Sequence, residues 1–189
     1  MKRLPYKKLE TQVCRACKRS FAEMLEAYPN EHFYTFALFM NDAIQTLHPF
    51  ANTEEQLDLT VSRYNKTVDK KYGGTSTRNG MRWGYGDWGV QDIGEDHFSA
   101  VNETLDRISN AFDSMEDQTV DECIERMLEA VLNGLNQLNQ EKVFGTGAKR
   151  SQITLLIVGD LPESWIDRGV RKLNPPSVAK RYCDWDTNA

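Results

Sequence analysis

The first residues that could do chemistry are two cysteines, Cys14 and Cys17, which form a C-x-x-C motif. Such a pair binds zinc when two more ligands complete a tetrahedral site, or exchanges disulfides when it opens a helix directly after a strand. The other two cysteines are single and distant, and the pair lies inside a run with helical periodicity. Phe21 and Met24 follow seven residues later, so both thiols should face the apolar side of that helix. We interpret the pair as core packing and predict no metal site and no cofactor.

A second candidate is the glycine-rich, basic stretch "FGTGAKRS", residues 144–151. A phosphate-binding loop requires G-x-x-x-x-G-K-[ST] between a strand and a helix. Here Gly145 and Gly147 are too close together, and an apolar, strand-like stretch follows. We therefore predict a solvated turn at Lys149 and Arg150, with contact to an acidic partner as the alternative.

Signs of nucleophilic or metal-assisted catalysis are missing from the sequence. Neither G-x-S-x-G nor H-E-x-x-H occurs. The three histidines, His32, His48 and His97, are scattered, and one of them could meet a carboxylate by chance in the folded chain. We predict no catalytic residues and a protein that is not an enzyme.

The stretch "MRWGYGDWG", residues 81–89, combines aromatic rings and charges with three glycines. Tryptophan brings a large apolar area and one N–H that needs an acceptor, which suits a structural anchor. Aromatic anchors also dominate protein interfaces. We favour the structural interpretation for Trp83, whereas Tyr85 and Trp88 could face outward. The predicted partner contacts here are Tyr85, Asp87 and Trp88.

Acidic residues are concentrated between and into two predicted helices. They are Asp113, Glu116, Asp117, Asp121, Glu122 and Glu125. One interpretation is a solvated linker whose charges complement a helix dipole. The other is a negative surface that docks onto a basic partner. On the second interpretation, Asp113, Glu116, Asp117 and Asp121 join the predicted partner-binding residues.

The elements that would position these residues begin with a helix over residues 9–28, where apolar side chains recur at helical spacing. "HFYTFALFMN" is apolar at alternating and intervening positions, which predicts a central strand covered on both faces. Asn41 and Asp42 are a turn signal, so "AIQTLHPF" should return as the second strand of a hairpin.

Further elements follow from capping signals and periodicity. Thr53 and Gln56 have capping-box spacing, predicting a helix that ends near Tyr72 and Gly73. "TSTRNG" reads as a polar loop, and "MRWGYGDW" as an extended segment.

A helix with Phe98 to Phe112 on its apolar face follows, and Thr119 with Glu122 suggests a second capping box. "QITLLIVGD" is the most buried-looking strand. A short helix and a turn at "NPP" complete the chain. This order predicts a single α+β domain over residues 1–189, with a mainly antiparallel sheet of about four strands and helices packed against it.

The bulk properties set limits on partners. The chain has 189 residues and a formal net charge of -5, which argues against nucleic acid and anionic membranes as partners. The basic N-terminus leads into no apolar run of signal-peptide length, and no stretch approaches the roughly 18 apolar residues of a membrane span. We expect a cytoplasmic protein with reduced thiols.

Several short motifs, in order, resemble a bacterial family, the domain of unknown function numbered 4303. They are "HFYTFALFMND", "NTEE", "MRWGYGDW", "EKVFGTGAKRSQITLLIVGD" and "KLNPP". The resemblance covers roughly residues 20–178, and the C-x-x-C motif and the tail "YCDWDTNA" depart from it. It implies a single α+β domain with an antiparallel sheet and no catalytic motif. Members are suggested to be immunity proteins encoded beside polymorphic toxins.

The residues that match the family's pattern look mostly like fold markers. They are Phe33, Tyr34, Phe36, Asn52, Arg82, Trp83, Trp88, Phe144, Gly145, Leu173, Asn174 and Pro175.

Together these observations predict a non-enzymatic protein that binds another protein, a cognate toxin, and neutralises it by occlusion. The alternative is a small-molecule-binding protein or an enzyme with a pocket around Arg82, Trp83, Trp88 and a histidine. A deep cleft with convergent polar groups would favour that alternative. A third hypothesis is self-association through the apolar face of the helix at 119–139, and the oligomeric state stays open.

Overall fold

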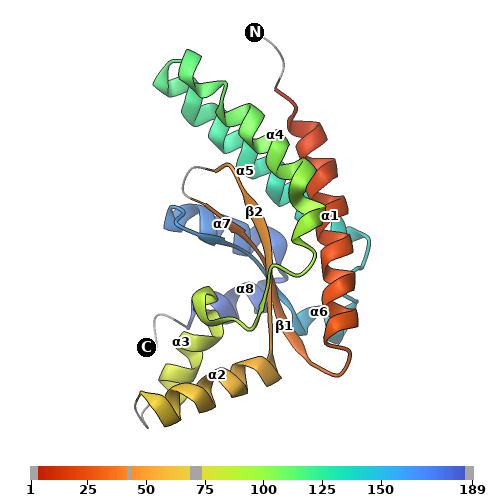
Figure 1. Cartoon of the computed structure of the whole chain (residues 1–189), viewed down its shortest axis with the longest axis vertical. Coiled ribbons are helices and arrows are strands. Elements are labelled where there is room, and N and C mark those ends of the chain that lie inside the picture. Colours follow the sequence, from red (N-terminus) through yellow and green to blue (C-terminus); the bar gives the residue numbers. More distant parts are fainter. Residues whose placement is uncertain (1–3, 42–43, 69–73, 186–189) are drawn as a thin grey trace.

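The computed structural model describes residues 4–41, 44–68 and 74–185. Figure 1 shows how the helices and strands are arranged and labels most of them. In order they are α1 (Tyr6–Ala27), β1 (Phe33–Met40), β2 (Leu47–Thr53), α2 (Glu54–Thr67), α3 (Thr75–Trp83), β3 (Val90–Gln91), α4 (Ser99–Ser109), α5 (Asp117–Gln140), α6 (Gly147–Gln152), β4 (Thr154–Gly159), α7 (Glu163–Leu173) and α8 (Pro176–Cys183). Short 3-10 turns at Tyr85–Asp87, Glu95–Phe98 and Phe112–Ser114 lie between them.

One four-stranded sheet, in the order β3-β2-β1-β4, forms the centre of the fold. β1 lies between β2 and β4, which confirms the central strand expected from its apolar residues. β1 and β2 pair antiparallel as the predicted hairpin, although Asp42 of the expected turn lies outside the described residues. β4 pairs parallel to β1, so the sheet is mixed, while its other two pairings are antiparallel as predicted.

A glycine ends the parallel pairing of β1 with β4. Gly159 pairs with Met40 and has φ +135°, and a Cβ placed on it would lie 2.0 Å from the Met40 carbonyl oxygen. Only glycine allows this approach, because any other residue would clash with the neighbouring backbone.

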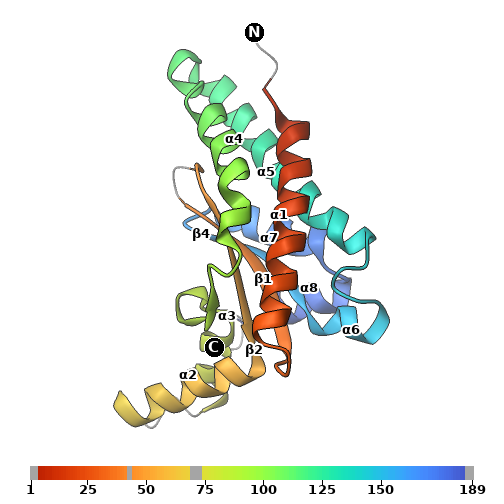
Figure 2. The same cartoon turned by 45° about the vertical axis from the view of Figure 1, so that its right-hand side comes forward.

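Each face of the sheet carries its own apolar cluster. Along β1, Phe36, Leu38 and Met40 face α1, α4 and α5, while Ala37 faces the cluster of α2, α3, α7 and α8. The pairing register shifts between Phe33 and Thr35, and such a bulge changes the direction of the side chains that follow. The two views agree that α1, α4 and α5 gather along one side, with α2 and α3 toward the opposite end of the long axis (Figure 1 and Figure 2).

Close packing of α1 against α5 stabilises the first face. A Cβ on Gly134 would lie 2.6 Å from the carbonyl oxygen of Glu10, so the two helices approach backbone to backbone there. Cys14 and Cys17 are both buried on the inner side of α1, as the apolar periodicity predicted.

The segment before β3 differs most from its prediction. "TSTRNG" was expected to be a loop and "MRWGYGDW" an extended strand, but residues Thr75–Trp83 form α3. The 3-10 turn Tyr85–Asp87 follows, and β3 has only two residues. Only Met81 and Trp83 of α3 are buried. Because so few apolar residues recur at helical spacing, the sequence showed little sign of a helix. Its glycines instead indicated a loop and an interrupted strand.

The two predicted capping boxes had different outcomes. The Thr53 side chain accepts a hydrogen bond from the Gln56 N–H at 3.0 Å, which confirms the start of α2. α2 ends at Thr67, before the expected end near Tyr72, and residues 72 and 73 lie outside the described part. Thr119 caps nothing, because α5 already begins at Asp117.

α8 follows the "NPP" turn and was not predicted. None of the described helices is both long enough and apolar enough to cross a bilayer.

Candidate functional site

A cleft of about 1110 Å³ opens at the end of the sheet where β1 and β4 begin. Its walls come from the end of α1, the start of β1, α3, the segment from the end of α5 into α6, and the end of α8. Small-molecule pockets measure about 300–1,000 Å³. The cleft is therefore large enough for several side chains of a bound chain.

Aromatic rings form the apolar wall. Tyr34 and Trp83 meet edge to face, with ring centroids 5.9 Å apart. On the α1 side, Phe21 packs against Phe33 at 5.7 Å and against Phe144 at 4.8 Å. All five residues are buried, so neighbouring rings hold this wall in one arrangement.

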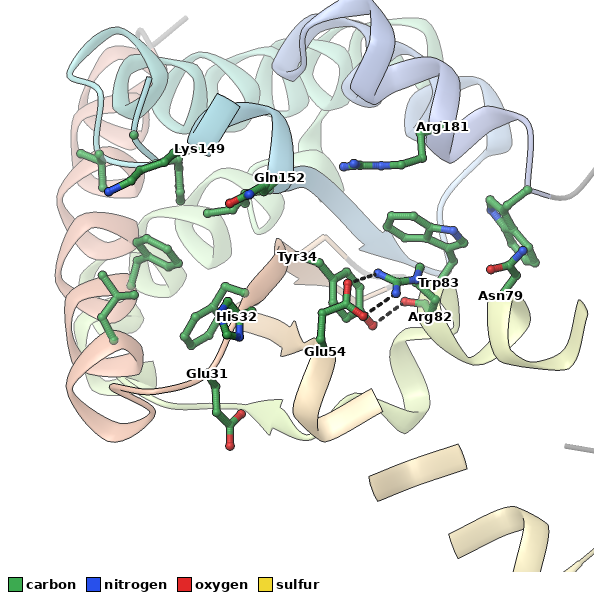
Figure 3. Close-up of a pocket in the computed structure, with 18 of the residues that line it drawn as sticks. Glu31, His32, Tyr34, Glu54, Asn79, Arg82, Trp83, Lys149, Gln152 and Arg181 are labelled. Atoms are coloured by element: carbon green, nitrogen blue, oxygen red, sulfur yellow. Dashed lines mark hydrogen bonds and ion pairs between the residues drawn. The ribbon is translucent and has the colours of Figure 1, made fainter. Parts of the chain in front are cut away.

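A bidentate ion pair lies on the α3 side. Arg82 Nη1 donates to Glu54 Oε1 at 2.8 Å and Nη2 donates to Oε2 at 2.5 Å. The Arg82 guanidinium also lies over the Tyr34 ring, 4.4 Å from its centroid. Glu54 opens α2 and Arg82 is in the last turn of α3, so the pair joins two helices (Figure 3). The charge of Arg82 is therefore already matched within the protein.

Behind this pair, a chain of hydrogen bonds anchors the glycine-rich segment. The Asn52 amide donates to the Tyr34 hydroxyl, which donates to the Arg82 carbonyl, both at 2.9 Å. The Trp88 indole N–H donates to the same carbonyl at 2.9 Å, and the Gly89 N–H donates to Asn52 Oδ1. Burial raises the pKa of Tyr34 well above its ordinary value, so its hydroxyl remains a donor. The arrangement accounts for these residues structurally.

Two cations line the cleft without an ion pair to any described carboxylate: Lys149 of α6 and Arg181 of α8. Arg181 Nη2 donates to Thr154 Oγ1 at 2.9 Å, and Nη1 donates to the Ser151 carbonyl at 3.2 Å. Partial desolvation and the nearby Arg82 guanidinium lower the pKa of Arg181. Figure 3 shows Arg181 extending from α8 over the cleft, above Trp83.

The exposed ring of His32 lies at the cleft mouth. Its Nδ1 is 2.6 Å from Glu55 Oε1, and its backbone N–H donates to Glu55 Oε2 at 2.8 Å. The side-chain bond to Glu55 raises the pKa of His32, and the backbone bond from His32 lowers the pKa of Glu55. The charged pair therefore stabilises the folded chain most at pH values between the lowered pKa of Glu55 and the raised pKa of His32. This stabilisation is lost as the pH rises through the pKa of His32, and as it falls through the pKa of Glu55.

We expect the His32 ring to titrate above its ordinary pKa of 6.5 in an NMR titration. Glu55→Gln should move that pKa back toward 6.5, since the charged acceptor is gone. Glu31→Gln is the matched control, because the Glu31 carboxylate is bonded to Thr53 and Gln56 and should leave His32 unchanged. An unshifted His32 in the native chain would mean that the pair does not form in solution.

The predicted contacts in the glycine-rich segment lie outside this cleft. Trp88 is 4% exposed, so the expectation that it faces outward is wrong. Tyr85 is half-buried against Phe39, with centroids 5.7 Å apart. Asp87 accepts a hydrogen bond from the Tyr64 hydroxyl at 2.7 Å. Asp87 and Trp88 border a separate, smaller hollow of about 310 Å³.

The acidic set lies elsewhere. Asp113, Glu116, Asp117 and Asp121 are exposed around the turn from α4 into α5. That turn lies at the far end of the long axis from α2 and α3 in both views (Figure 1 and Figure 2). The structure therefore does not bring the acidic set and the glycine-rich segment into one surface.

Much of the cleft could not be identified from the sequence. The pocket expected around Arg82, Trp83, Trp88 and a histidine is present in part, since Arg82, Trp83 and His32 line the cleft and Trp88 does not. Lys149, expected in a solvated turn, is exposed and lines the cleft as well. Arg150, expected beside it in water, is 8% exposed, and that prediction is wrong.

Arg181 and Glu54 were not predicted as site residues. Glu54 lies in the "NTEE" motif and Arg181 in none of the motifs, but neither pattern points to a site, because both residues meet the rest of the cleft only through the tertiary fold.

The sequence profile of the family described as Domain of unknown function (DUF4303) matches residues 13–175. The chain belongs to this family. The match confirms the resemblance seen in the motifs. Neither the curated proteins nor the solved structures contain a significant match to the chain. The DUF4303 match includes the α1, β1, α3 and α6 walls of the cleft, whereas Arg181 lies beyond it.

One group of possible metal ligands occurs among the described residues. His48, Asp92 and Glu95 place their ligand atoms within 4.8 Å of one another, with His48 Nδ1 3.5 Å from Asp92 and 3.7 Å from Glu95. Both carboxylates are exposed, so a solvated charge cluster accounts for the group. It does not involve the C-x-x-C motif, whose thiols are buried in the core.

Proposed function

We propose that this DUF4303 protein acts by binding another protein, and that the cleft receives a segment of that partner. The observation that carries the proposal is the cleft itself, an opening of about 1110 Å³ with a preformed aromatic wall beside fixed charges. Interfaces concentrate their binding energy in such pockets, where aromatic and arginine side chains are already ordered before binding.

The composition of the cleft supports binding over catalysis. Its described lining contains no serine, threonine or cysteine that could serve as a nucleophile. Its one described histidine, His32, is exposed and bonded to Glu55 on the outer side of the rim. The carboxylates of Glu31 and Glu54 are already engaged by donors of the protein. The hydrogen bonds of these three side chains therefore stabilise the local structure of the cleft wall.

Members of the DUF4303 family are suggested to be immunity proteins, and this suggestion supports a bacterial toxin as the partner. Inhibition would then follow from occlusion, because a complex that buries about 1,600 Å² in total covers an active site or substrate groove. The acidic turn between α4 and α5 is a second candidate contact, suited to a basic partner. Its distance from the cleft lets experiment separate the two surfaces.

The test is co-purification of the full chain with the product of the adjacent gene, using variants that each alter one surface. Leu25→Glu places a charge at the cleft rim, where Leu25 is 45% exposed, and should weaken binding at least tenfold without unfolding the chain. Leu59→Glu is the matched control. Leu59 is also an exposed leucine, but it borders the smaller hollow with Asp87 and Trp88.

A third variant neutralises the acidic turn by replacing Asp113, Glu116, Asp117 and Asp121 with their amides. Loss of binding only in this variant would place the contact on the turn, and loss only in Leu59→Glu would place it at the smaller hollow. If the three variants all bind as the native chain does, the cleft is not the contact surface.

A small molecule is the second candidate for the cleft. Arg82, Glu54 and Arg181 converge there, and the pKa of Arg181 is lowered by partial desolvation. Convergent polar groups beside aromatic rings are the usual lining of ligand sites.

A further inference from the structure

We infer that the cleft recognises a carboxylate borne by an apolar segment of the partner protein, and that Arg181 is the residue that pairs with it. The identity of the partner as a protein rests on the proposed function. The charge of the recognised group rests on the cleft alone.

The charges around the cleft are unevenly satisfied. Arg82 is neutralised by Glu54 through two hydrogen bonds. Glu31 accepts from the Thr53 hydroxyl and the Gln56 amide. Both of these glutamates of the cleft lining therefore already have donors within the protein.

The cations on the opposite wall differ. Asp184, the acidic residue closest in sequence to Arg181 among the lining residues, pairs with Lys180 at 2.5 Å. Within the described chain, neither Arg181 nor Lys149 forms an ion pair with a carboxylate, and Glu54, which is paired with Arg82, acts on Arg181 only as a nearby charge. The whole chain nevertheless carries a net charge of -5. Two cations without an ion pair that line the same opening, beside aromatic rings, favour an anionic ligand there.

Arg181 is also positioned for this role before any ligand arrives. Its two terminal nitrogens each donate once to the protein, to Ser151 and Thr154. A guanidinium carries five N–H donors in a planar fork, so donors remain for a carboxylate. Both protein acceptors are uncharged, so the guanidinium is held in place without an ion pair, and the Glu54 carboxylate acts on it only as a nearby charge.

The surroundings indicate what accompanies the carboxylate. Trp83 and Tyr34 line the cleft beside Arg181, and Leu25 leaves an apolar surface at the rim. An aspartate or glutamate flanked by apolar or aromatic side chains matches this combination. The cleft lies at the upper end of the size range of small-molecule pockets, so a chain segment can enter it.

The experiment uses two kinds of probe on the full chain. A displayed library of random 12-residue peptides is panned against the native protein, and enriched peptides are synthesised with each acidic residue intact or changed to its amide. Phenylacetate and its uncharged counterpart phenylacetamide are titrated in parallel by NMR.

We expect peptides that pair an acidic residue with apolar neighbours, and a loss of affinity of roughly tenfold or more when that residue becomes an amide. Arg181→Met should cause a similar loss of affinity for the intact peptide. The amide peptide should bind this variant about as weakly as the intact peptide does, because both changes remove the same arginine–carboxylate contact. Arg107→Met, at an exposed arginine of α4 remote from the cleft, should change nothing.

Each other result has a defined meaning. Peptides that lose binding in Leu25→Glu but not in Arg181→Met overturn the carboxylate inference and leave the proposed function in place. If phenylacetate binds through Arg181 while no peptide does, the carboxylate site stands and the partner is not a protein segment. Binding of neither probe overturns the inference, and co-purification with the adjacent gene product then tests the proposed function separately.

Discussion

Trp88→Ala is expected to lower the free energy of unfolding by about 3–5 kcal/mol, the usual cost of removing a buried tryptophan. The indole is 4% exposed and lies in the apolar cluster that contains Leu57 and Met81. Its N–H donates to the Arg82 carbonyl, which holds the end of α3. The substitution leaves a cavity and removes that bond. Urea unfolding followed by circular dichroism measures the effect.

Trp88→Phe separates the two contributions. It keeps most of the apolar volume and loses only the N–H, so we expect a smaller cost of about 1–2 kcal/mol. An alanine variant as stable as the native chain would contradict the buried position. Such a result would return Trp88 to the partner-facing role that its sequence context suggested. Loss of partner binding in Trp88→Ala has meaning only when its folded fraction has been measured.

The sequence pattern predicted the helices and strands in which buried apolar residues recur at regular spacing. α1 and α5 repeat apolar residues over many turns, and β1 is apolar on both faces, so its central place followed directly. The helix α3 was not predicted, because most of its residues are polar. Its two buried residues, Met81 and Trp83, make contacts that only the tertiary fold provides. β4 was recognised as a buried strand, but its parallel partner depends on a connection of more than a hundred residues.

The candidate site depends on such long-range assembly even more. Arg82 and Trp83 attracted attention through their composition, whereas the significance of Glu54 appears only when α2 and α3 meet. Arg181 belongs to α8, a helix that the sequence did not predict, and its pairing state cannot be inferred without knowing which carboxylates are already occupied. Sequence patterns identify residues that can bind, while the fold decides which of them remain unpaired.

Arg150→Met is expected to lower the free energy of unfolding by about 2–4 kcal/mol, since it leaves the Asn139 side-chain oxygen and the Ile153 carbonyl without this donor, and each such buried acceptor costs about 1–3 kcal/mol. The Leu173 and Asn174 acceptors keep the donors of Asn139 and Leu155. Arg150 Nη2 donates to the Leu173 carbonyl at 2.8 Å and to Asn174 Oδ1 at 3.1 Å. Nε donates to Asn139 and Nη1 to the Ile153 carbonyl. Burial, with a contribution from Arg181, lowers the pKa of Arg150 to about 10, and relief of that desolvation offsets part of the loss.

Chemical unfolding of two companion variants makes the prediction specific. Lys149→Met, one residue earlier, is the matched control. Because Lys149 is exposed, the free energy of unfolding of this variant should stay within about 0.5 kcal/mol of the native value. Arg150→Lys keeps the charge but not the planar fork, so it should recover only part of the loss. Arg150 joins α6 to α5, to Ile153 just before β4 and to the end of α7, so its loss should also disorder the α6 wall of the cleft. Equal stability of Arg150→Met and Lys149→Met would show that this hydrogen-bond network does not hold the wall.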